Sequence, residues 1–344
     1  MKSLRMAKRH LPKFLESLGK WGKVYVPVKL GKNSYRWEEF DGEVDNIALD
    51  ALRTVIPAKK FFYKPREVMF EYDKTNGYTQ ACAECEEDVI LFGIHSCGIH
   101  SLETLDNIFA GKYVDNYYFT RRKNITIVGT SCMPDRHCFC KSMGADTVDE
   151  GYDIFLTDLG DDFLIGVGSS KGDDIVNDNP EIYEEVDEST TKRYLEFRNK
   201  RDESFELVLD TSDLPTILDF QYDNPLWDEL GERCLACGSC SMVCPTCYCY
   251  NVDDTINLDS ETGERWREWD CCLFRDHALV AGGHNFRENQ GGRLKHRYLH
   301  KQQAYLGDFG RTACVGCGRC IVACPANIDY VECLKAMRGE MTNA

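Results

Sequence analysis

Several kinds of segment are missing from this chain of 344 residues. No apolar run approaches the roughly 20 residues that cross a bilayer. No G-x-G-x-x-G stretch follows a predicted strand and no P-loop is present, so the sequence carries no nucleotide-binding motif. The basic start, Met1–Trp21, lacks the apolar core and cleavage site of a signal peptide and is predicted to form an amphipathic first helix. We therefore expect a cytoplasmic protein with no membrane span.

Excess positive charge is also missing. The chain has 41 Lys and Arg residues against 57 Asp and Glu residues, which gives a formal net charge of −16. A protein that binds nucleic acid needs a basic face to neutralise phosphates, so this balance argues against a nucleic-acid partner. An acidic chain is better suited to protein partners of basic or mixed charge.

Cysteine, in contrast, is abundant, with 19 residues. Nothing marks the chain for export, the number is odd, and many cysteines are separated by only two residues. This spacing suits a metal better than disulfides. We infer a reducing compartment, typical of anaerobic or low-potential metabolism.

The predicted fold class is α+β, in three segments. Residues 1–175 are expected to form an α/β domain, residues 176–225 an acidic helical connector, and residues 226–344 a mainly helical, ferredoxin-like dicluster domain. Helical spacing is expected at Ile99–Phe109, and a solvated, mixed-charge helix at Thr190–Asp202. Runs rich in Val, Ile and Phe predict strands at Val24–Leu30, Asp88–Ile94, Asn124–Thr130, Asp153–Thr157 and Phe163–Val167.

Two cysteine runs are the most specific feature. The pattern C-x-x-C-x-x-C-x-x-x-C-P occurs at Cys234–Pro245 and again at Cys314–Pro325. It is the spacing of bacterial two-cluster ferredoxins, in which three cysteines hold one cubane and the fourth reaches the other. Gly238 and Gly318 follow the second cysteine of each run, where the backbone is expected to pass close to a sulfide. Zinc is the alternative, but it prefers pairs of C-x-x-C motifs.

The two runs therefore predict two interlocked [4Fe–4S] clusters. The ligands of the first cluster are Cys234, Cys237, Cys240 and Cys324, and those of the second are Cys314, Cys317, Cys320 and Cys244. Such a pair can conduct electrons but leaves no iron open to a substrate. The pattern favours a relay over catalysis, and no catalytic residue is assigned.

A third group of cysteines follows two predicted strands. Cys97 comes after Asp88–Ile94, and Cys132, Cys138 and Cys140 come after Asn124–Thr130. Strand ends at one edge of a parallel sheet converge, so the four thiols can meet there. The spacing alone fits a third cluster, a zinc ion or unligated thiols. Nearby histidines could replace a cysteine as ligand but are more commonly ordinary polar residues: His95, His100 and His137.

The other cysteines are less informative. Three thiols beside the first run could hold another metal, but packing or weak hydrogen bonds to cluster sulfides is the favoured role: Cys247, Cys249 and Cys272. Cys82 and Cys85 form a bare C-x-x-C in an acidic loop and are expected to be unligated. The segment from Trp266 to His284, with nearby arginines, could neutralise cluster charge, dock a partner or simply wrap the domain: Arg265, Arg267, Arg275 and Arg287.

Longer strings resemble a known family. Cys234-Leu-Ala-Cys237-Gly through Cys244-Pro-Thr-Cys247-Tyr-Cys249-Tyr is similar to the iron–sulfur β subunit of cytoplasmic sulfhydrogenases, which are NAD(P)-linked [NiFe] hydrogenases with sulfur reductase activity. The same family includes the iron–sulfur relay subunit of anaerobic sulfite reductase. Further similar strings are Trp266–Asp270, Leu279–Arg287, Arg297–Lys301, Trp21–Lys29, Lys59–Arg66, Ser131–Asp135 and Cys138–Cys140. Four cysteines match no motif of the family: Cys82, Cys85, Cys271 and Cys333.

This resemblance implies a third [4Fe–4S] cluster on Cys97, Cys132, Cys138 and Cys140. It also implies an electron-transfer subunit of a hetero-oligomer, placed between one partner that binds flavin and NAD(P) and another that is catalytic. The strings Cys-Met-Pro-Asp and Val-Ala-Gly-Gly-His are closer to the sulfhydrogenases, so a hydrogenase partner is preferred. Sulfite reductase and heterodisulfide-reductase-type complexes are the alternatives.

Two functions of other classes are less well supported. An iron–sulfur redox sensor would need an exposed or labile cluster and an output surface, whereas interlocked clusters suit a relay. A stand-alone reductase would need an open-coordinate iron or a flavin, and the sequence indicates neither.

Overall fold

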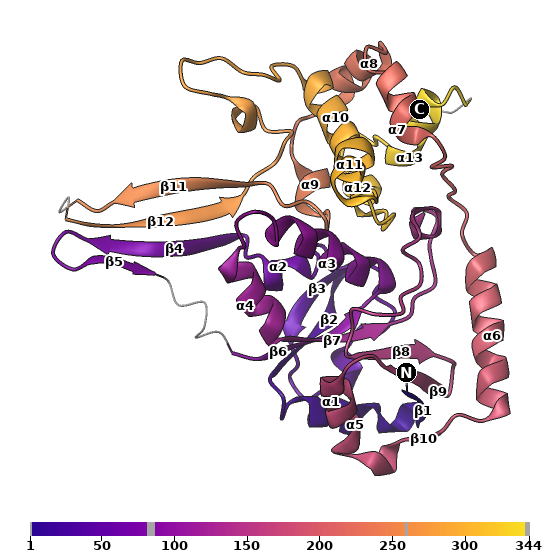
Figure 1. Cartoon of the computed structure of the whole chain (residues 1–344). Coiled ribbons are helices and arrows are strands. Elements are labelled where there is room, and N and C mark those ends of the chain that lie inside the picture. Colours follow the sequence, from indigo (N-terminus) through magenta and orange to yellow (C-terminus); the bar gives the residue numbers. More distant parts are fainter. Residues whose placement is uncertain (1, 81–86, 259–260, 341–344) are drawn as a thin grey trace.

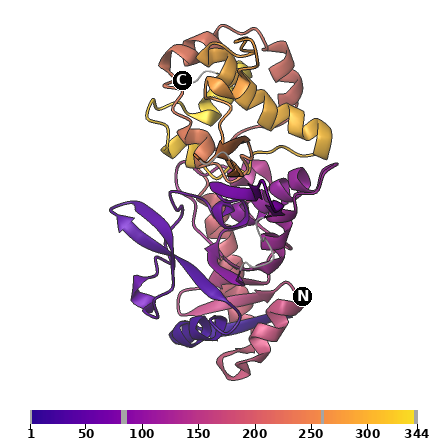
Figure 2. The same ribbon diagram turned by 90° about the vertical axis from the view of Figure 1, so that its left-hand side faces the viewer.

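The computed structural model of the chain describes residues 2–80, 87–258 and 261–340. A sheet domain that contains the N-terminus lies at one end, and a mainly helical domain that contains the C-terminal segment lies at the other (Figure 1). A view from the side shows the molecule to be elongated along the line that joins these two parts (Figure 2). Among the described residues, no helix is long and apolar enough to cross a membrane.

The larger sheet has eight strands among the described residues, in the order β10-β1-β9-β8-β7-β6-β2-β3. Strands β2, β6, β7 and β8 run parallel, and their neighbours on both sides are antiparallel. The central β7, with the sequence ITIVGT, is buried along almost its whole length, as expected for a parallel strand covered on both faces. The bounds are β1 Lys2–Ala7, β2 Lys23–Gly31, β3 Ser34–Glu39, β6 Val89–Ile94, β7 Ile125–Thr130, β8 Ile154–Asp158, β9 Asp162–Val167 and β10 Glu184–Glu185.

Helices cover both faces of this sheet. On one face, α1 (Leu11–Leu18) and α5 (Ser170–Asn177) pack on side chains such as Ile90 and Val128. On the other face, α3 and α4 pack on the alternate side chains, such as Ile127. Their bounds are α3 Ser96–Phe109 and α4 Asn116–Asn124. The alternation of the buried strands thus supplies two apolar layers from one sheet.

A second sheet joins the N-terminal half of the chain to the segment between the two cysteine runs. It has four strands among the described residues, in the order β11-β12-β4-β5, with β4 Arg66–Asp73, β5 Gly77–Gln80, β11 Tyr250–Ile256 and β12 Thr262–Trp269. The pairing of β4 with β12 brings the buried Arg267 against Glu67, with Nε and Oε1 2.6 Å apart, and against Asp115. Breaking a buried ion pair of this kind costs about 3–5 kcal/mol. The insertion between the two cysteine runs is therefore firmly bound to the N-terminal half.

The connector contains α6 (Glu188–Glu203), which runs along one side of the molecule toward the helical domain (Figure 1). The helical domain packs around Trp227, Tyr298 and Leu334. The remaining helices are α2 Lys59–Phe62, α7 Leu214–Phe220, α8 Leu226–Arg233, α9 Ser239–Met242, α10 Gln290–Leu299, α11 Tyr305–Phe309, α12 Arg319–Val322 and α13 Tyr330–Met337. A π-helical turn, His300–Ala304, continues α10.

The structure confirms the five predicted strands and both predicted helices, with ends shifted by a few residues. The prediction of a first helix over Met1–Trp21 is wrong for its start, since Lys2–Ala7 is a strand that pairs with β9 and buries Met6. A helix forms only at Leu11–Leu18. The α+β class is confirmed, whereas the domain boundaries at 175 and 225 stay predictions.

Candidate metal centres

The two ferredoxin runs fold into the same local turn. In the first run, Gly238 has φ of +74° and begins α9, and in the second, Gly318 has φ of +71° and begins α12. A Cβ on Gly238 would lie 2.6 Å from the Phe274 ring, and a Cβ on Gly318 would lie 2.3 Å from the His137 carbonyl oxygen. Besides the expected approach to a sulfide, glycine is thus required by the left-handed turn and by close packing.

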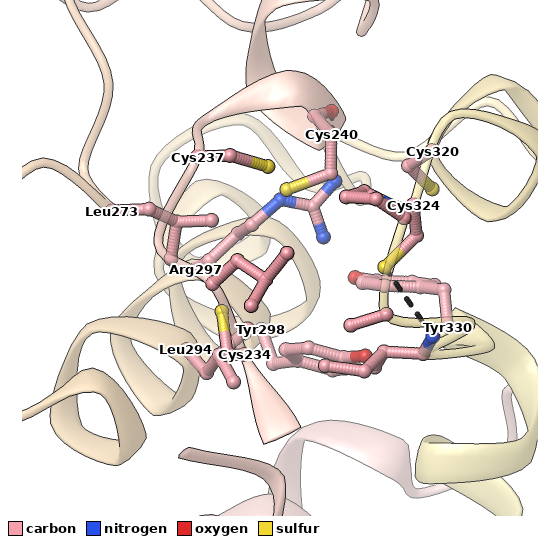
Figure 3. A pocket seen from close by; sticks show the side chains of 14 residues that line it. Cys234, Cys237, Cys240, Leu273, Leu294, Arg297, Tyr298, Cys320, Cys324 and Tyr330 are labelled. Carbon is pink, nitrogen blue, oxygen red and sulfur yellow. Dashed lines mark hydrogen bonds between the residues drawn. The ribbon is translucent and has the colours of Figure 1, made fainter. Parts of the chain in front are cut away.

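The four cysteines predicted for the first cluster line one cavity, here cavity A: Cys234, Cys237, Cys240 and Cys324. Figure 3 shows their side chains around a common space, beside the guanidinium of Arg297. The amide nitrogen of Ala236 donates a hydrogen bond to the Cys234 sulfur (3.4 Å), and that of Ile328 donates to the Cys324 sulfur (3.3 Å). Backbone N–H groups directed at sulfur stabilise a thiolate.

The four cysteines predicted for the second cluster line another cavity, here cavity B: Cys244, Cys314, Cys317 and Cys320. Cys244 comes from the first run, so the exchange of the fourth ligand between runs is present in the geometry. Burial raises the pKa of the Cys314 thiol to about 12. Iron that binds here would have to displace the thiol protons.

The N-terminal cysteines line a third cavity, here cavity C: Cys97, Cys132, Cys138 and Cys140. Cys97 opens α3 directly after β6, and Cys132 follows β7, the parallel neighbour of β6. The carboxyl ends of these strands meet at one edge of the sheet, as expected for a ligand site in such a fold. Burial raises the pKa of Cys138 to about 12.

The three cavities share walls. Arg297, Cys320 and Tyr330 line both A and B. Cys317 and Pro245 line both B and C. The cavities therefore form a continuous series A–B–C that crosses from the helical domain into the sheet domain.

The contact between B and C depends on a glycine. The amide nitrogen of Phe139 donates to the carbonyl oxygen of Gly316 at 2.9 Å. Gly316 has φ of +63°, and a Cβ there would lie 2.5 Å from the Phe139 carbonyl. The second ferredoxin run can thus lie directly against the Cys138–Cys140 loop because no side chain separates them.

The donor set of each cavity fits a cubane. The four predicted ligands line each space, one for each iron, and cavities A and C are also lined by a cysteine of the second run, Cys320 and Cys317 respectively. Every described cysteine is a free thiol. Among the residues that the structure describes, no three Cys, His, Asp or Glu side chains are close enough to hold a single metal ion. A cubane needs a wider arrangement than one ion, because each thiolate binds a different iron.

Two arginines from outside the cysteine motifs, the partly buried Arg53 and the buried Arg201, line cavity C. Arg53 binds Asp135 through two hydrogen bonds of 2.6 Å and donates to the Cys138 sulfur at 3.0 Å. Arg201, from the connector helix α6, donates to the Cys132 carbonyl oxygen at 2.8 Å and pairs with Asp146. Although burial would raise the pKa of Asp135, Arg53 holds that pKa below its ordinary value. The helix predicted to be merely solvated thus contributes a side chain to the site.

Two more buried cations, Arg297 and Lys301, line cavity B. Neither was predicted to take part in a site. A signal was present, since they lie four residues apart, on one helical face, in a string that resembles the family.

The arginines for which neutralisation of cluster charge was one of three possible roles line none of cavities A, B and C. Arg265 pairs with Asp254 on the exposed hairpin, and Arg267 pairs with Glu67 and Asp115. Arg287 lies beside His296. The strand pairing of the segment supports the interpretation as a structural wrap, because β12 is hydrogen-bonded to β4 along its length.

The unassigned thiols differ in their surroundings. Cys247 is hydrogen-bonded to Cys244, which lowers the pKa of Cys244, and both lie near Lys301. The pKa of Cys272 is raised by its hydrogen bond with Cys271, by burial, and by the charges of Cys247 and Cys249. Cys271 and Cys333 are fully buried in the core of the helical domain. Cys82 and Cys85 lie outside the described residues.

The rings of the three nearby histidines have partners within the chain, and that of His137 accepts a hydrogen bond from Arg136 Nε at 3.2 Å. Both ring nitrogens of His95 lie within 3.0 Å of carbonyl oxygens, those of Thr130 and Ala51. His100 Nε2 lies 2.7 Å from the Thr147 carbonyl oxygen, and the His137 backbone packs on Gly318. These contacts favour the four-cysteine set over a histidine ligand.

Comparison with known proteins agrees with this geometry. A 4Fe–4S dicluster domain model matches residues 233–328, which include both ferredoxin runs. The chain is 42% identical over 338 residues to the sulfhydrogenase 2 subunit beta of Pyrococcus furiosus, in a match that covers 98% of this chain and 99% of the relative. The chain belongs to the sulfhydrogenase β-subunit family. No solved structure matches it significantly.

Membership of the sulfhydrogenase β-subunit family confirms the resemblance predicted from the sequence. The dicluster domain shows that this family member carries 4Fe–4S clusters. Together they make the chain an iron–sulfur electron-transfer subunit.

Proposed function

We propose that this chain relays electrons through three [4Fe–4S] clusters, held in cavities A, B and C. The ligands of each cluster are the four cysteines predicted for its cavity. A cluster bound by four thiolates takes up and releases an electron without opening an iron to substrate. The relay runs from or to a partner that binds flavin and NAD(P), and its other end meets the catalytic subunit of a [NiFe] sulfhydrogenase.

The observation that carries the proposal is the series of shared walls. Cys320 lines both A and B, and Cys317 lines both B and C. A ligand of the middle cluster thus lies at the wall of each neighbouring cavity. Such close spacing is what a relay needs, whereas a sensor would need only one labile cluster.

Both ends of the series approach the surface. Cys237 at cavity A is exposed, and its neighbour Leu235 is 66% exposed. At cavity C, Cys132 is partly exposed and is followed by the exposed Met133. Partner proteins can therefore deliver electrons at one end and remove them at the other.

The relative's name supports the choice of partners. That protein is named a subunit of a sulfhydrogenase, so we place the present chain in a hetero-oligomer of the same type. The free thiols agree with a complex in a reducing cytoplasm. The excess of acidic residues agrees with protein partners and not with nucleic acid. The chain itself supplies no catalytic residue in this proposal.

Iron and sulfide analysis of the anaerobically purified chain tests the number of clusters. Three cubanes predict about twelve irons per chain. A value below about ten irons would contradict the three-cluster proposal. EPR of the reduced protein should show signals of interacting [4Fe–4S] clusters, because A and B share ligand-bearing walls.

Anaerobic co-purification from the native host tests the partners. The proposal predicts recovery of a flavoprotein and a [NiFe] subunit with this chain. Recovery of a siroheme subunit would instead assign the chain to a sulfite reductase, and recovery of heterodisulfide-reductase-type subunits would assign it to that class. Recovery of none of these would contradict the relay between subunits.

A further inference from the structure

Arg297 lies where cavities A and B meet. It belongs to α10, is only 4% exposed and lines both cavities. One guanidinium nitrogen donates to the Cys240 carbonyl oxygen at 3.3 Å, and the guanidinium lies 5.1 Å from the centre of the Tyr330 ring. The Nε atom is buried and has no hydrogen-bond partner among the residues that the structure describes.

Lys301 lies one helical turn further on and lines cavity B but not cavity A. It is 3% exposed, and its Nζ donates to Thr246 Oγ1 at 2.8 Å. The same Thr246 oxygen lies 3.3 Å from the Cys244 sulfur. The ammonium is therefore linked to a predicted ligand through one hydroxyl.

Neither cation has an ion pair with a carboxylate within the part of the chain that the structure describes. The acidic groups that raise their pKa values are mainly cysteine thiols. The pKa of Arg297 is raised, against the effect of burial, by Cys240, Cys320 and Cys247. The pKa of Lys301 is raised in the same way by Cys244 and Cys247. A buried cation is costly unless an anion compensates it, so these two fit a negatively charged group in the cavities.

Cavity C is different. Two of its arginines, Arg53 and Arg201, are each paired with an aspartate, Asp135 and Asp146. Their positive charge is therefore largely neutralised by the chain itself. Arg319 also lines cavity C, and it has no carboxylate ion pair among the described residues. The cations at cavity B and on its wall with A differ from it in their deeper burial, since Arg297 is 4% and Lys301 3% exposed.

A cubane with four thiolates is negative and becomes more negative on reduction. A nearby cation stabilises the reduced form more than the oxidised form and raises the reduction potential. We propose that Arg297 and Lys301 set the potentials of the relay: Lys301 raises that of the cluster in B alone, and Arg297 raises those in both A and B. This inference rests on the proposed function, because it needs clusters in both cavities.

The test is an EPR-monitored redox titration of the full chain with its clusters, purified anaerobically. Lys301→Gln should lower the potential of one cluster, and Arg297→Gln should lower the potentials of two. We expect a change of about tenfold in the ratio of reduced to oxidised cluster at a fixed potential, which is about 59 mV for one electron. Arg297→Lys and Lys301→Arg retain the charge and should restore most of each shift.

Lys295→Gln is the matched control. It removes the same charge from the same helix, but Lys295 lies over the Tyr222 ring at 3.7 Å and lines none of cavities A, B and C. The reduction potentials of the clusters in the Lys295→Gln variant should equal those of the unmodified chain. Lys301→Met and Arg297→Met, which fill similar space without charge, replace the glutamine variants if these lose iron.

Unchanged potentials in a neutral variant that keeps its iron would overturn the inference and leave the proposed function intact. Equal shifts of both clusters in the Lys301 variant would overturn the assignment of Lys301 to B alone. An unmodified chain without clusters in A and B would instead contradict the proposed function. Iron content, measured on every sample, separates these outcomes.

Discussion

The two ferredoxin cavities and cavity C are each lined by four predicted cysteine ligands but are built in different ways. Cavities A and B come from two short runs that repeat one turn, with Gly238 and Gly318 at equivalent positions. Cavity C is assembled from the ends of β6 and β7, a loop, and Arg201 of the distant connector helix. The comparison shows that one kind of site can be encoded either by local spacing or by the arrangement of a whole sheet.

The largest effect is expected from a substitution at the contact between the second ferredoxin run and the Cys138–Cys140 loop, here called the B–C seam. Gly316→Val would place a side chain against the Phe139 carbonyl at a positive φ, where both the contact and the backbone are unfavourable. We expect a loss of about 3 kcal/mol or more in stability and the loss of iron from both B and C. Iron content and anaerobic thermal unfolding measure the two effects.

Gly310→Val is the control for the B–C seam. Gly310 has φ of +70°, but a Cβ there would have no atom of the described residues within 4 Å, so only the backbone strain remains. This variant should lose about 1 kcal/mol and keep all its iron. Equal damage in both variants would show that the contact between the second run and the Cys138–Cys140 loop is unimportant.

Substitution of a single predicted ligand should remove one cluster and so test whether the two regions hold their clusters independently. Cys140→Ser should remove the cluster of cavity C, about a third of the iron, and leave the EPR signals of A and B. Cys244→Ser should remove the cluster of B, although Cys244 belongs to the run whose other cysteines line A. Loss of all iron in Cys140→Ser would show that the two regions do not hold their clusters independently.

A smaller effect, on the rate of iron release from cavity C, is expected from a substitution in the connector helix α6. Arg201→Met removes the bonds to the Cys132 carbonyl and to Asp146 and leaves a carboxylate without its partner, at a cost of about 3 kcal/mol. Cavity C should then release iron to a chelator several-fold faster than the unmodified chain, while A and B are unaffected. Lys200→Met, on the exposed face of the same helix, should release iron at the normal rate.

The smallest effect lies at the base of the hairpin that joins the regions. A hydrogen bond with Cys249 and a second, weaker contribution from a hydrogen bond with Asp270 raise the pKa of His277 to about 9. The pKa of histidine in an unfolded chain is about 6.5. A raised pKa stabilises the fold fully below about pH 6.5, and this contribution is lost as the pH rises through 9. His277→Gln should therefore reduce stability by about 1–3 kcal/mol at pH 6 and by little at pH 10.

Anaerobic unfolding at these two pH values measures the difference between His277→Gln and the unmodified chain. His10→Gln, in the sheet domain, serves as the control. An equal destabilisation at both pH values would show that the imidazole acts through packing and not through its charge.

Much of the fold was predictable because its signals are local. The β-branched run Ile125–Thr130 predicts a buried strand wherever it lies, and the ferredoxin spacing predicts its turn. Lys2–Ala7 was mispredicted because its polar, basic composition resembles a helix start, and only pairing with β9 makes it a strand. The pairing of β12 with β4, far apart in the chain, had no local signal at all.

The sequence by itself determined which thiols belong to cavities A and B, because three cysteines in one turn must face one space and proline ends that turn. It also indicated the family through long similar strings. Only the tertiary structure decided that the three cavities adjoin, through Gly316 against Phe139 and through shared walls. It alone also decided which cations lie at each cavity, since Arg53, Arg201 and Lys301 come from separate elements that approach one another only when the chain folds.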